Sequence, residues 1–250
     1  MKKMEENMQH HFKKKLEDWL KKVYAGCRKF ALQRGNNLDF YVFLSSVIEN
    51  PKILFIGVNP FGDRCYDETA DKHLWGCKLW NKLIYSDNNA YIKNRYSKCW
   101  GPISESMCSI FYDDPFFRND FEFNSVLMNI YYFNTTSIEK LNALPHIKKI
   151  KRFCVAQTRT LISDILHPKV IITLGNDAFD NLNQNKKIVY PLLMKNGKPL
   201  MKLGQYNSIP IIWLANPSKR NQHYYTDEYK AMVLKELKHI FNVLEERNAF

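Results

Sequence analysis

Short apolar runs alternate along the chain with longer segments in which apolar residues recur every three or four positions. Four of the runs are typical of buried strands, and they cover residues 53–57, 125–132, 168–175 and 209–215. The periodic segments predict helices over residues 1–35, 79–85, 147–166 and 226–246. A further helix is predicted to begin at Asn176. Strands separated by helices pair in parallel through right-handed crossovers. The pattern therefore predicts an α/β fold, a three-layer α/β/α sandwich around a small four-stranded parallel sheet.

One domain accounts for the whole pattern. The chain has 250 residues, of which 45% are hydrophobic, and this is enough for one sizeable core. Lysines separate the apolar positions of the first helix, so we expect its apolar face to pack and its basic face to lie outside. We therefore expect a single domain over residues 1–250, with residues 1–48 as an N-terminal helical extension packed on it.

The positive charge of the chain favours a polyanionic partner. Lys and Arg number 37 against 25 Asp and Glu, which gives a formal net charge of +12. Charge alone does not separate nucleic acid from a membrane surface, but no run approaches the roughly 20 apolar residues that span a bilayer. The N-terminus lacks the apolar core of a signal peptide. We expect a soluble, cytoplasmic monomer that does not attach to membranes.

The cysteines and histidines favour neither a metal nor a disulfide framework. The six cysteines include no Cys-x-x-Cys pair, and the seven histidines lack the spacing of metal ligands. Four of the cysteines are an alternative set for an iron–sulfur cluster, which usually includes at least one tight pair: Cys65, Cys77, Cys99 and Cys108. We expect reduced thiols, no metal and no cofactor.

Three of the four predicted strands end in asparagine. Asn59 and Asn216 each precede a proline, and Asn129 lies near the end of the second predicted strand. The carboxyl ends of parallel strands are where ligands bind in such sheets. An amide is neutral, accepts and donates hydrogen bonds, and can orient a water or read the edge of a base. The alternative is that each asparagine only forms a turn.

Five motifs in this order resemble the uracil-DNA glycosylase superfamily, over residues 50–225. Residues 57–62 (Gly-Val-Asn-Pro-Phe-Gly) resemble the Gly-x-Asn-Pro-Gly motif of its single-strand-selective and mismatch-specific branches. Residues 216–221 (Asn-Pro-Ser-Lys-Arg-Asn) resemble the second motif, His-Pro-Ser or Asn-Pro-Ser. Residues 126–129, 79–83 and 169–179 are similar to the central strand, an aromatic-Trp helix and a further strand and helix.

The resemblance implies a glycosylase that flips a nucleotide out of DNA and hydrolyses its N-glycosidic bond. The base is uracil or a modified pyrimidine, and the product is an abasic site. By this resemblance Asn59 orients the hydrolytic water, Asn129 reads the base edge, and Asn216 supports the leaving base or the sugar. No lysine lies among these residues to form a Schiff base, so we expect a monofunctional enzyme.

The resemblance also implies how DNA is held. Base-binding positions are Gly57, Pro60 and Phe61, and Tyr66 and Trp75 are either walls of the base pocket or core residues. The loop after the second motif would bind the backbone and push into the duplex, with Ser218 holding a phosphate or starting a helix. The remaining DNA-binding positions are Lys219, Arg220, Asn221 and His223. The basic run at residues 148–152 is a solvated helix face or a further contact with DNA.

Two departures from the family pattern leave other functions open. Phe61 replaces the usual glycine after Asn-Pro, and Asn216 stands where many relatives have histidine. The altered pocket is consistent with a glycosylase that removes hypermodified bases from phage DNA in defence. It is also consistent with an inactive glycosylase fold that only reads DNA. A nucleotide-binding α/β protein of another family is the remaining alternative.

Overall fold

The computed structural model places the four predicted strands next to one another. It describes residues 2–33, 36, 38–60, 62, 64–67, 89–97, 101–184, 190–195, 198–216 and 226–246. Strands β1 (Ile53–Gly57), β2 (Ser125–Asn129), β3 (Val170–Leu174) and β6 (Ile209–Leu214) pair in parallel, in the order β2-β1-β3-β6. The predicted α/β fold with a parallel sheet is thus confirmed within these residues.

The predicted number of four strands is wrong. Strands β4 (Tyr190–Lys195) and β5 (Lys198–Tyr206) extend the sheet to six strands in the described part of the chain. They form a hairpin, and β5 pairs with β6 in antiparallel fashion. The sequence does contain a hairpin signal, because Asn196 and Gly197 separate the two strands. Lysines within the strands interrupt the apolar pattern on which the prediction depended.

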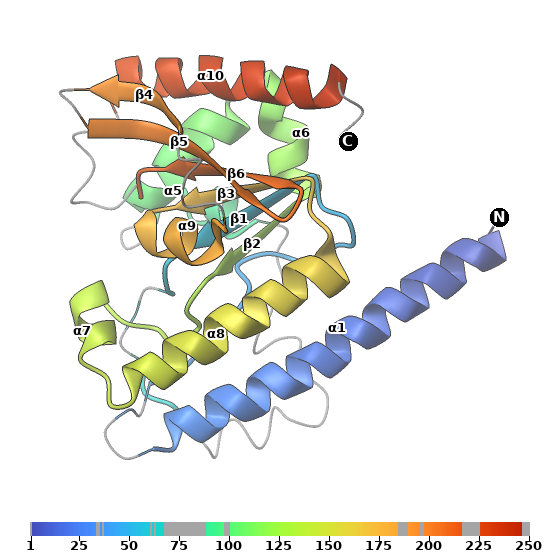
Figure 1. Cartoon of the computed structure of the whole chain (residues 1–250), viewed down its shortest axis with the longest axis vertical. Coiled ribbons are helices and arrows are strands. Elements are labelled where there is room, and N and C mark those ends of the chain that lie inside the picture. Colours follow the sequence, from blue (N-terminus) through green and yellow to red (C-terminus); the bar gives the residue numbers. More distant parts are fainter. Residues whose placement is uncertain are drawn as a thin grey trace.

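Helices cover both faces of the sheet, as Figure 1 shows. One face carries α8 (Ile147–Leu161), its π-helical continuation η2 (Ile162–Leu166) and α9 (Asn176–Leu182). The other face carries α5 (Gly101–Met107), the π-helical segment η1 (Cys108–Tyr112), α6 (Pro115–Phe123) and α10 (Asp227–Glu246). Two short helices, α4 (Ala90–Lys93) and α7 (Ile138–Asn142), lie in the connections. The predicted three-layer arrangement is therefore present.

Aromatic side chains fill the layer between the sheet and α10. Phe55 of β1 packs edge-on against Phe111 and Phe121, with ring centroids 4.9 and 5.4 Å apart. Phe117 then contacts Phe241 of α10 at 5.1 Å. Both faces of β1, β2 and β3 are covered, so these strands are apolar along nearly their whole length.

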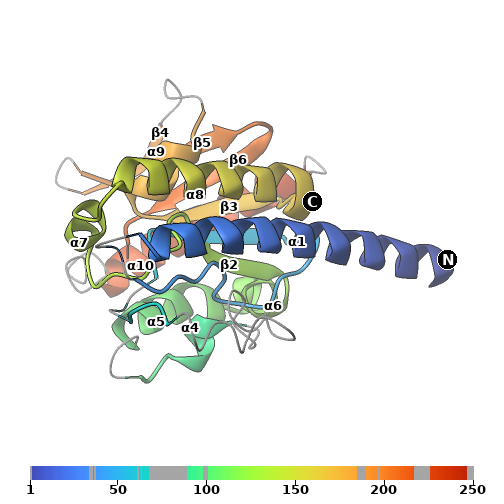
Figure 2. The same cartoon turned by 90° about the horizontal axis from the view of Figure 1, so that it is seen from below.

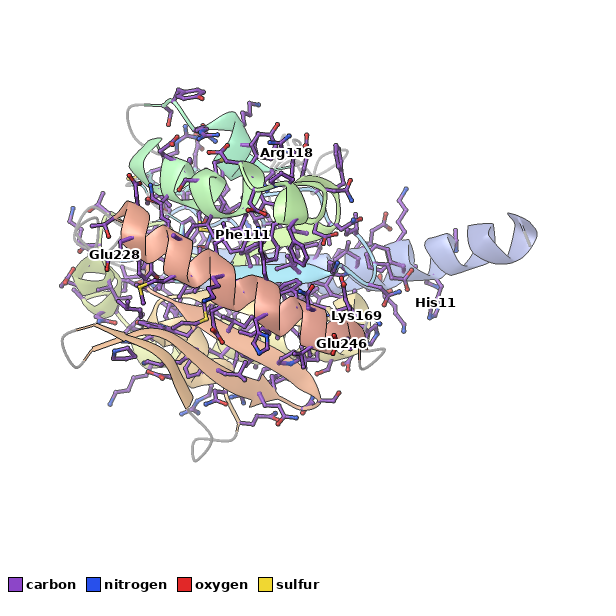
Figure 3. The ribbon with its side chains drawn as sticks, turned by 90° about the horizontal axis from the view of Figure 1, so that it is seen from above. His11, Phe111, Arg118, Lys169, Glu228 and Glu246 are labelled. Carbon is purple, nitrogen blue, oxygen red and sulfur yellow. The ribbon has the colours of Figure 1, made fainter. Side chains whose placement is uncertain are left out.

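The N-terminal helix α1 (Lys2–Ala31) packs beside α8 and then extends past the rest of the molecule (Figure 2). Trp19 donates a hydrogen bond from Nε1 to the carbonyl oxygen of Gln157, 3.0 Å away, and its ring lies 5.9 Å from that of Phe43. Phe30 contacts Phe153 of α8 at 5.7 Å. His11 lies on the projecting part of the helix in Figure 3. The second half of α1 is therefore part of the core.

Candidate functional site

The parallel strands bring the three predicted asparagines to one edge of the sheet. Asn129 is the last residue of β2, Asn59 follows β1 by two residues, and Asn216 follows β6 by two. The backbone beyond β2 continues beside the backbone beyond β1, because Ile130 donates a hydrogen bond to the carbonyl of Gly57 at 2.9 Å. Neighbouring parallel strands share their carboxyl edge. We call this group the strand-end site.

Gly57 allows Asn129 to lie against the backbone of β1. The two residues are paired in register, and a Cβ atom on Gly57 would lie 2.7 Å from Oδ1 of Asn129. This distance is shorter than a carbon and an oxygen can approach without a shift. Glycine is therefore required here by close approach of the asparagine side chain.

Asn129 has a buried hydrogen-bond donor without a partner. Its side chain is 3% exposed, and its Nδ2 atom makes no hydrogen bond. The backbone N–H of Asn129 donates to Val42 at 3.2 Å, so the main chain is held in place. Leaving a buried polar group unpaired costs roughly 1–3 kcal/mol. A ligand oxygen that accepted from Nδ2 would remove this cost.

Asn59 is oriented by the segment that follows β2. Its Nδ2 atom donates to the carbonyl oxygen of Thr135 at 3.2 Å, to Oγ1 of Thr135 at 2.9 Å and to the carbonyl oxygen of Pro60 at 3.0 Å. Thr135 in turn donates from Oγ1 to the carbonyl oxygen of Ser137 at 2.8 Å. Since carbonyl oxygens only accept, the amide nitrogen must face them. The Oδ1 atom of Asn59 accepts nothing from the described residues and remains available to a donor.

Asn216 lies beside the start of α9. A Cβ atom on Gly175 would lie 3.5 Å from Cβ of Asn216 and 3.5 Å from Cγ2 of Val58. Gly175 has a φ of +103°, which side chains rarely adopt, and its N–H donates to Leu214 at 3.0 Å. The glycine turn thus joins the ends of β1, β3 and β6 and brings the loop of Asn59 close to Asn216.

Tyr131, two residues after Asn129, belongs to a polar cluster that it forms with side chains of α8 and α9. Tyr131 donates from its hydroxyl to Asp177 at 3.2 Å and accepts from Asn181 at 3.1 Å. Lys151 lies 3.6 Å from Asp177 and 4.7 Å from the centre of the Tyr131 ring. Burial, followed by the nearby Asp177 carboxylate, raises the pKa of Tyr131 well above its usual range. The tyrosine therefore stays protonated and keeps donating to Asp177.

Asn134 and Thr135 belong to the site and were not predicted from the sequence. Asn134 is 1% exposed, and its Oδ1 atom has no hydrogen-bond partner. Its Nδ2 atom would lie 3.1 Å from a Cβ on Gly62, so it is close to the loop after Asn59. The only signal in the sequence was a polar Asn-Thr-Thr run shortly after the second strand.

Tyr66 and Pro60 are both buried. Tyr66 is 6% exposed, and its ring stacks on that of Phe40 with a centroid distance of 5.7 Å and an interplanar angle of 21°. The carbonyl oxygen of Pro60 accepts from the N–H of Thr135 at 3.1 Å. Packing against Phe40 makes Tyr66 part of the core, and its role as a wall of the base pocket stays a prediction.

The family of the chain follows from a comparison with protein-family models. A model described as the uracil DNA glycosylase superfamily matches residues 45–238. The chain belongs to this superfamily. The match spans the six-stranded sheet and all three asparagines of the strand-end site. A search of curated proteins finds no match.

Membership of the uracil-DNA glycosylase superfamily implies DNA binding, and members of the superfamily are typically hydrolases that act as DNA glycosylases. It confirms the resemblance found in the sequence at the level of the superfamily, whereas the branch stays a prediction. Residues 2–33, which include α1, lie outside the matched region.

Several predicted positions of this glycosylase fold lie outside the described residues. They are Phe61 and Trp75, the helix at 79–85, and the whole predicted DNA-binding loop with Ser218, Lys219, Arg220, Asn221 and His223. Their roles stay predictions from the sequence. The structure therefore brings together Gly57, Asn59, Pro60, Asn129 and Asn216 from the predicted set.

Neither a metal-binding group of side chains nor a membrane-spanning helix is found among the described residues. Among them, no group of three or more His, Cys, Asp or Glu side chains could hold a metal ion. Of the four cysteines considered for a cluster, Cys65 is exposed and Cys108 is buried, while Cys77 and Cys99 are not described. No described helix is both long and apolar enough to cross a bilayer.

Proposed function

We propose that this protein is a monofunctional DNA glycosylase that releases uracil or a modified pyrimidine and leaves an abasic site. The observation that carries the proposal is the buried, unpartnered Nδ2 atom of Asn129 at the same edge of the sheet as the oriented amide of Asn59. A flipped pyrimidine with a carbonyl oxygen would accept from Nδ2. Cytosine has an amino group, a hydrogen-bond donor, at position 4, where uracil has a carbonyl oxygen. A protein donor that faces position 4 therefore favours uracil-like bases.

Asn59 is the proposed water-orienting residue. Its nitrogen is committed to Thr135 and Pro60, so its oxygen can accept from a water placed near the sugar. Cleavage of an N-glycosidic bond gives the sugar oxocarbenium character, and a positioned water then adds to the anomeric carbon. An amide does not remove the proton fully at neutral pH, so Asn59 acts mainly by holding the water in line.

Asn216 and the Asn129 donor are proposed to stabilise the leaving base. Negative charge develops on the base as the bond breaks, and fixed hydrogen-bond donors reduce the barrier. A donor of this kind contributes about 2.7–4 kcal/mol in well-studied cases. The proposed backbone contacts of Ser218, Lys219, Arg220 and Asn221, with His223, would offset the unstacking cost of about a few kcal/mol.

A non-catalytic reader of flipped DNA is the second candidate. The observation in its favour is that the predicted catalytic residues of the strand-end site, Asn59 and Asn216, are neutral amides. Such a protein would bind a flipped nucleotide through Asn129 and release no base. A glycosylase with the same site would bind and then form an abasic product.

A substrate panel separates these functions. Wild-type protein is incubated with single- and double-stranded oligonucleotides that carry uracil, mismatched bases or hypermodified cytosines, and abasic sites are then cleaved with alkali and counted. We expect product with at least one uracil-like base. Product only with hypermodified cytosines would favour the defence role, and tight binding without product would favour the reader.

The Asn59→Ala variant tests the water assignment on the best substrate of the panel. We expect its single-turnover rate of base release to fall by about 100-fold, which lies within the range for loss of one positioned catalytic group. Asn119→Ala is the matched control, because Asn119 is an exposed asparagine of α6 on the other side of the sheet from α8. Full activity of Asn59→Ala would overturn the assignment.

A further inference from the structure

Most of the net positive charge of the chain lies on two neighbouring helices. α1 has nine Lys and Arg residues against four Asp and Glu, and α8 has five Lys and Arg residues and no acid. The two helices contain 30 and 15 residues, and they carry ten of the twelve net charges of the chain. The net positive charge is therefore concentrated on one part of the molecule, where it can form a basic binding surface.

The two helices pack side by side in antiparallel fashion, as Figures 1 and 2 both show. Phe30 near the end of α1 contacts Phe153 in the middle of α8, whereas Trp19 reaches Gln157 further along α8. At Gly26 a Cβ atom would overlap the ring of Phe153, so the helices are in close contact there. This contact fixes which side chains lie along the junction.

Basic side chains line both sides of the junction. Lys15, Lys22 and Lys29 recur every seven residues on α1, and all three are exposed. Lys15 and Lys22 each lie one helical turn before a residue that touches α8, namely Trp19 and Gly26. On α8, the exposed residues Lys149 and Arg152 lie close to the Phe153 contact. We call the set Lys15, Lys22, Lys29, Lys149 and Arg152 the α1–α8 surface.

The α1–α8 surface is not neutralised from within the described part of the molecule. No carboxylate of the described residues forms an ion pair with its five side chains. Asp18 lies on the same side of α1, but its ion pair is with Lys21 at 3.8 Å. Lys151 of α8 pairs with Asp177 on the side toward α9. Like charges that stay unpaired repel one another, and an anionic partner would relieve this.

The surface begins near the strand-end site. The chain runs from Thr135, which holds Asn59, through Ser137 and α7 directly into α8. Figure 1 shows α7, the start of α8 and the end of α1 close together at the same side of the molecule. Lys29 and Lys149 therefore lie at the near end of the surface, and Lys15 at the far end.

We propose that the α1–α8 surface binds the phosphate backbone of the same nucleic acid whose nucleotide enters the strand-end site. The proposal rests on the proposed function only in taking DNA as the ligand. Lys15 and Lys29 are separated by about 21 Å at 1.5 Å per helical residue. That length equals about six phosphate intervals along one strand. DNA would thus be held along this surface while one of its nucleotides lies in the strand-end site.

The test compares two double variants that remove the same charge. Lys29→Gln/Lys149→Gln removes two residues of the surface. Lys169→Gln/Lys235→Gln removes two exposed lysines that lie elsewhere. Lys235 is on α10, and Lys169 directly precedes β3, at the edge of the sheet opposite the strand-end site. Lys169 lies near the Glu246 end of α10 in Figure 3 and donates from its backbone to Pro51 just before β1. Exposed positions of this kind have little effect on folding.

Binding to a duplex without any damaged base is measured by fluorescence anisotropy at several salt concentrations. The slope of log K against log salt is negative, and each lost phosphate contact makes it less steep by about 0.9. The slope of the surface variant should therefore be less steep than that of wild type by about one to two units. We expect its affinity at moderate salt to fall by about tenfold and the control pair to match wild type. Equal losses in both pairs, or no loss in either, would overturn the proposal.

Two further comparisons identify the ligand and separate this proposal from the glycosylase assignment. In the first comparison, the binding of wild type and of the surface variant to vesicles that contain phosphatidylserine is measured. A surface variant that binds these vesicles less well than wild type but binds DNA equally well would contradict a nucleic-acid partner. A protein that releases no base from any substrate but shows the slope difference would refute the proposed function and support this surface.

Discussion

At the scale of single residues, Gly57 controls the position of the proposed base-reading side chain. A Cβ atom there would lie 2.7 Å from Oδ1 of Asn129, so Gly57→Ala must displace that amide or the backbone of β1. We expect the free energy of unfolding to fall by about 1–3 kcal/mol, as for other overpacked core sites. Urea denaturation measures this, and single-turnover assays should show slower base release. Unchanged stability and rate would mean that Asn129 has another position.

The raised pKa of Tyr41 leads us to expect a loss of stability at alkaline pH. Burial and the hydrogen bond to Asp39, 2.5 Å away, raise the pKa of Tyr41 to about 12. The unfolded chain releases this proton near pH 10, its ordinary value. The stabilisation is therefore complete below about pH 10 and is lost as the pH rises through about 12.

The Tyr41→Phe variant isolates this contribution. Other buried tyrosines such as Tyr91 also have raised pKa values, so the wild type and the variant should both lose stability. We expect the free energy of unfolding of Tyr41→Phe, from urea titrations at several pH values, to fall less steeply between about pH 10 and 12. Parallel curves would show that the Tyr41 proton is not linked to folding.

The described cysteines should differ sharply in reactivity. Cys65 is exposed, whereas Cys108 and Cys154 are buried, and burial raises the pKa of each of the two buried thiols to about 12. Only the thiolate is alkylated, so at neutral pH these two should react only after unfolding. Iodoacetamide labelling followed by peptide mass spectrometry should find Cys65 modified in the native protein. Native labelling of Cys154 would contradict the buried packing between α1 and α8.

The sequence predicted the strand-end asparagines but not the residues that orient them. Asn59, Asn129 and Asn216 follow apolar runs, and the rule that parallel strands share a carboxyl edge is enough to bring them together. The contact between Asn59 and Thr135 joins residues that are 76 positions apart. No local pattern encodes such a pair, because it depends on how the loops beyond β1 and β2 run side by side.

At the scale of elements, α1 is expected to stabilise the domain although it lies outside the matched family region. Trp19 is 4% exposed, packs on Phe43 and donates to Gln157. Trp19→Ala should reduce the free energy of unfolding by about 3–5 kcal/mol, the usual cost of truncating a buried aromatic residue. Lys14→Ala on the exposed face is the control for urea denaturation. A cost for Trp19→Ala as small as that of the control would show that α1 is only loosely attached.

The parallel strands were predictable because both of their faces are covered. β1 and β3 begin and end within two residues of the predicted runs, whereas β2 ends three residues earlier than expected, at Asn129. The hairpin of β4 and β5 lies at the edge of the sheet and mixes lysines with apolar residues. An edge strand needs less apolar surface than a central one. The sequence signal for this hairpin is the Asn196-Gly197 pair rather than apolar periodicity.

At the scale of the whole molecule, the fold separates the chemical site from the charge. Neutral amides occupy the carboxyl edge of the sheet, and ten of the twelve net positive charges lie on α1 and α8 at its side. This division suits the proposed glycosylase, which must hold a polyanion firmly while it binds one neutral base. Charge composition predicted a polyanionic partner, but only the antiparallel packing of α1 on α8 shows where the charge gathers.

The rate of base release by an Asn129 variant tests the central claim most directly. Wild type, Asn129→Ala and the control Asn119→Ala are compared in single-turnover assays on a uracil-containing oligonucleotide, with abasic sites as the readout. The account predicts release by wild type and by the control, and a loss of about 100-fold or more for Asn129→Ala, since the donor to the leaving base is gone. Release by Asn129→Ala at the wild-type rate, with circular dichroism confirming that it folds, would contradict the account.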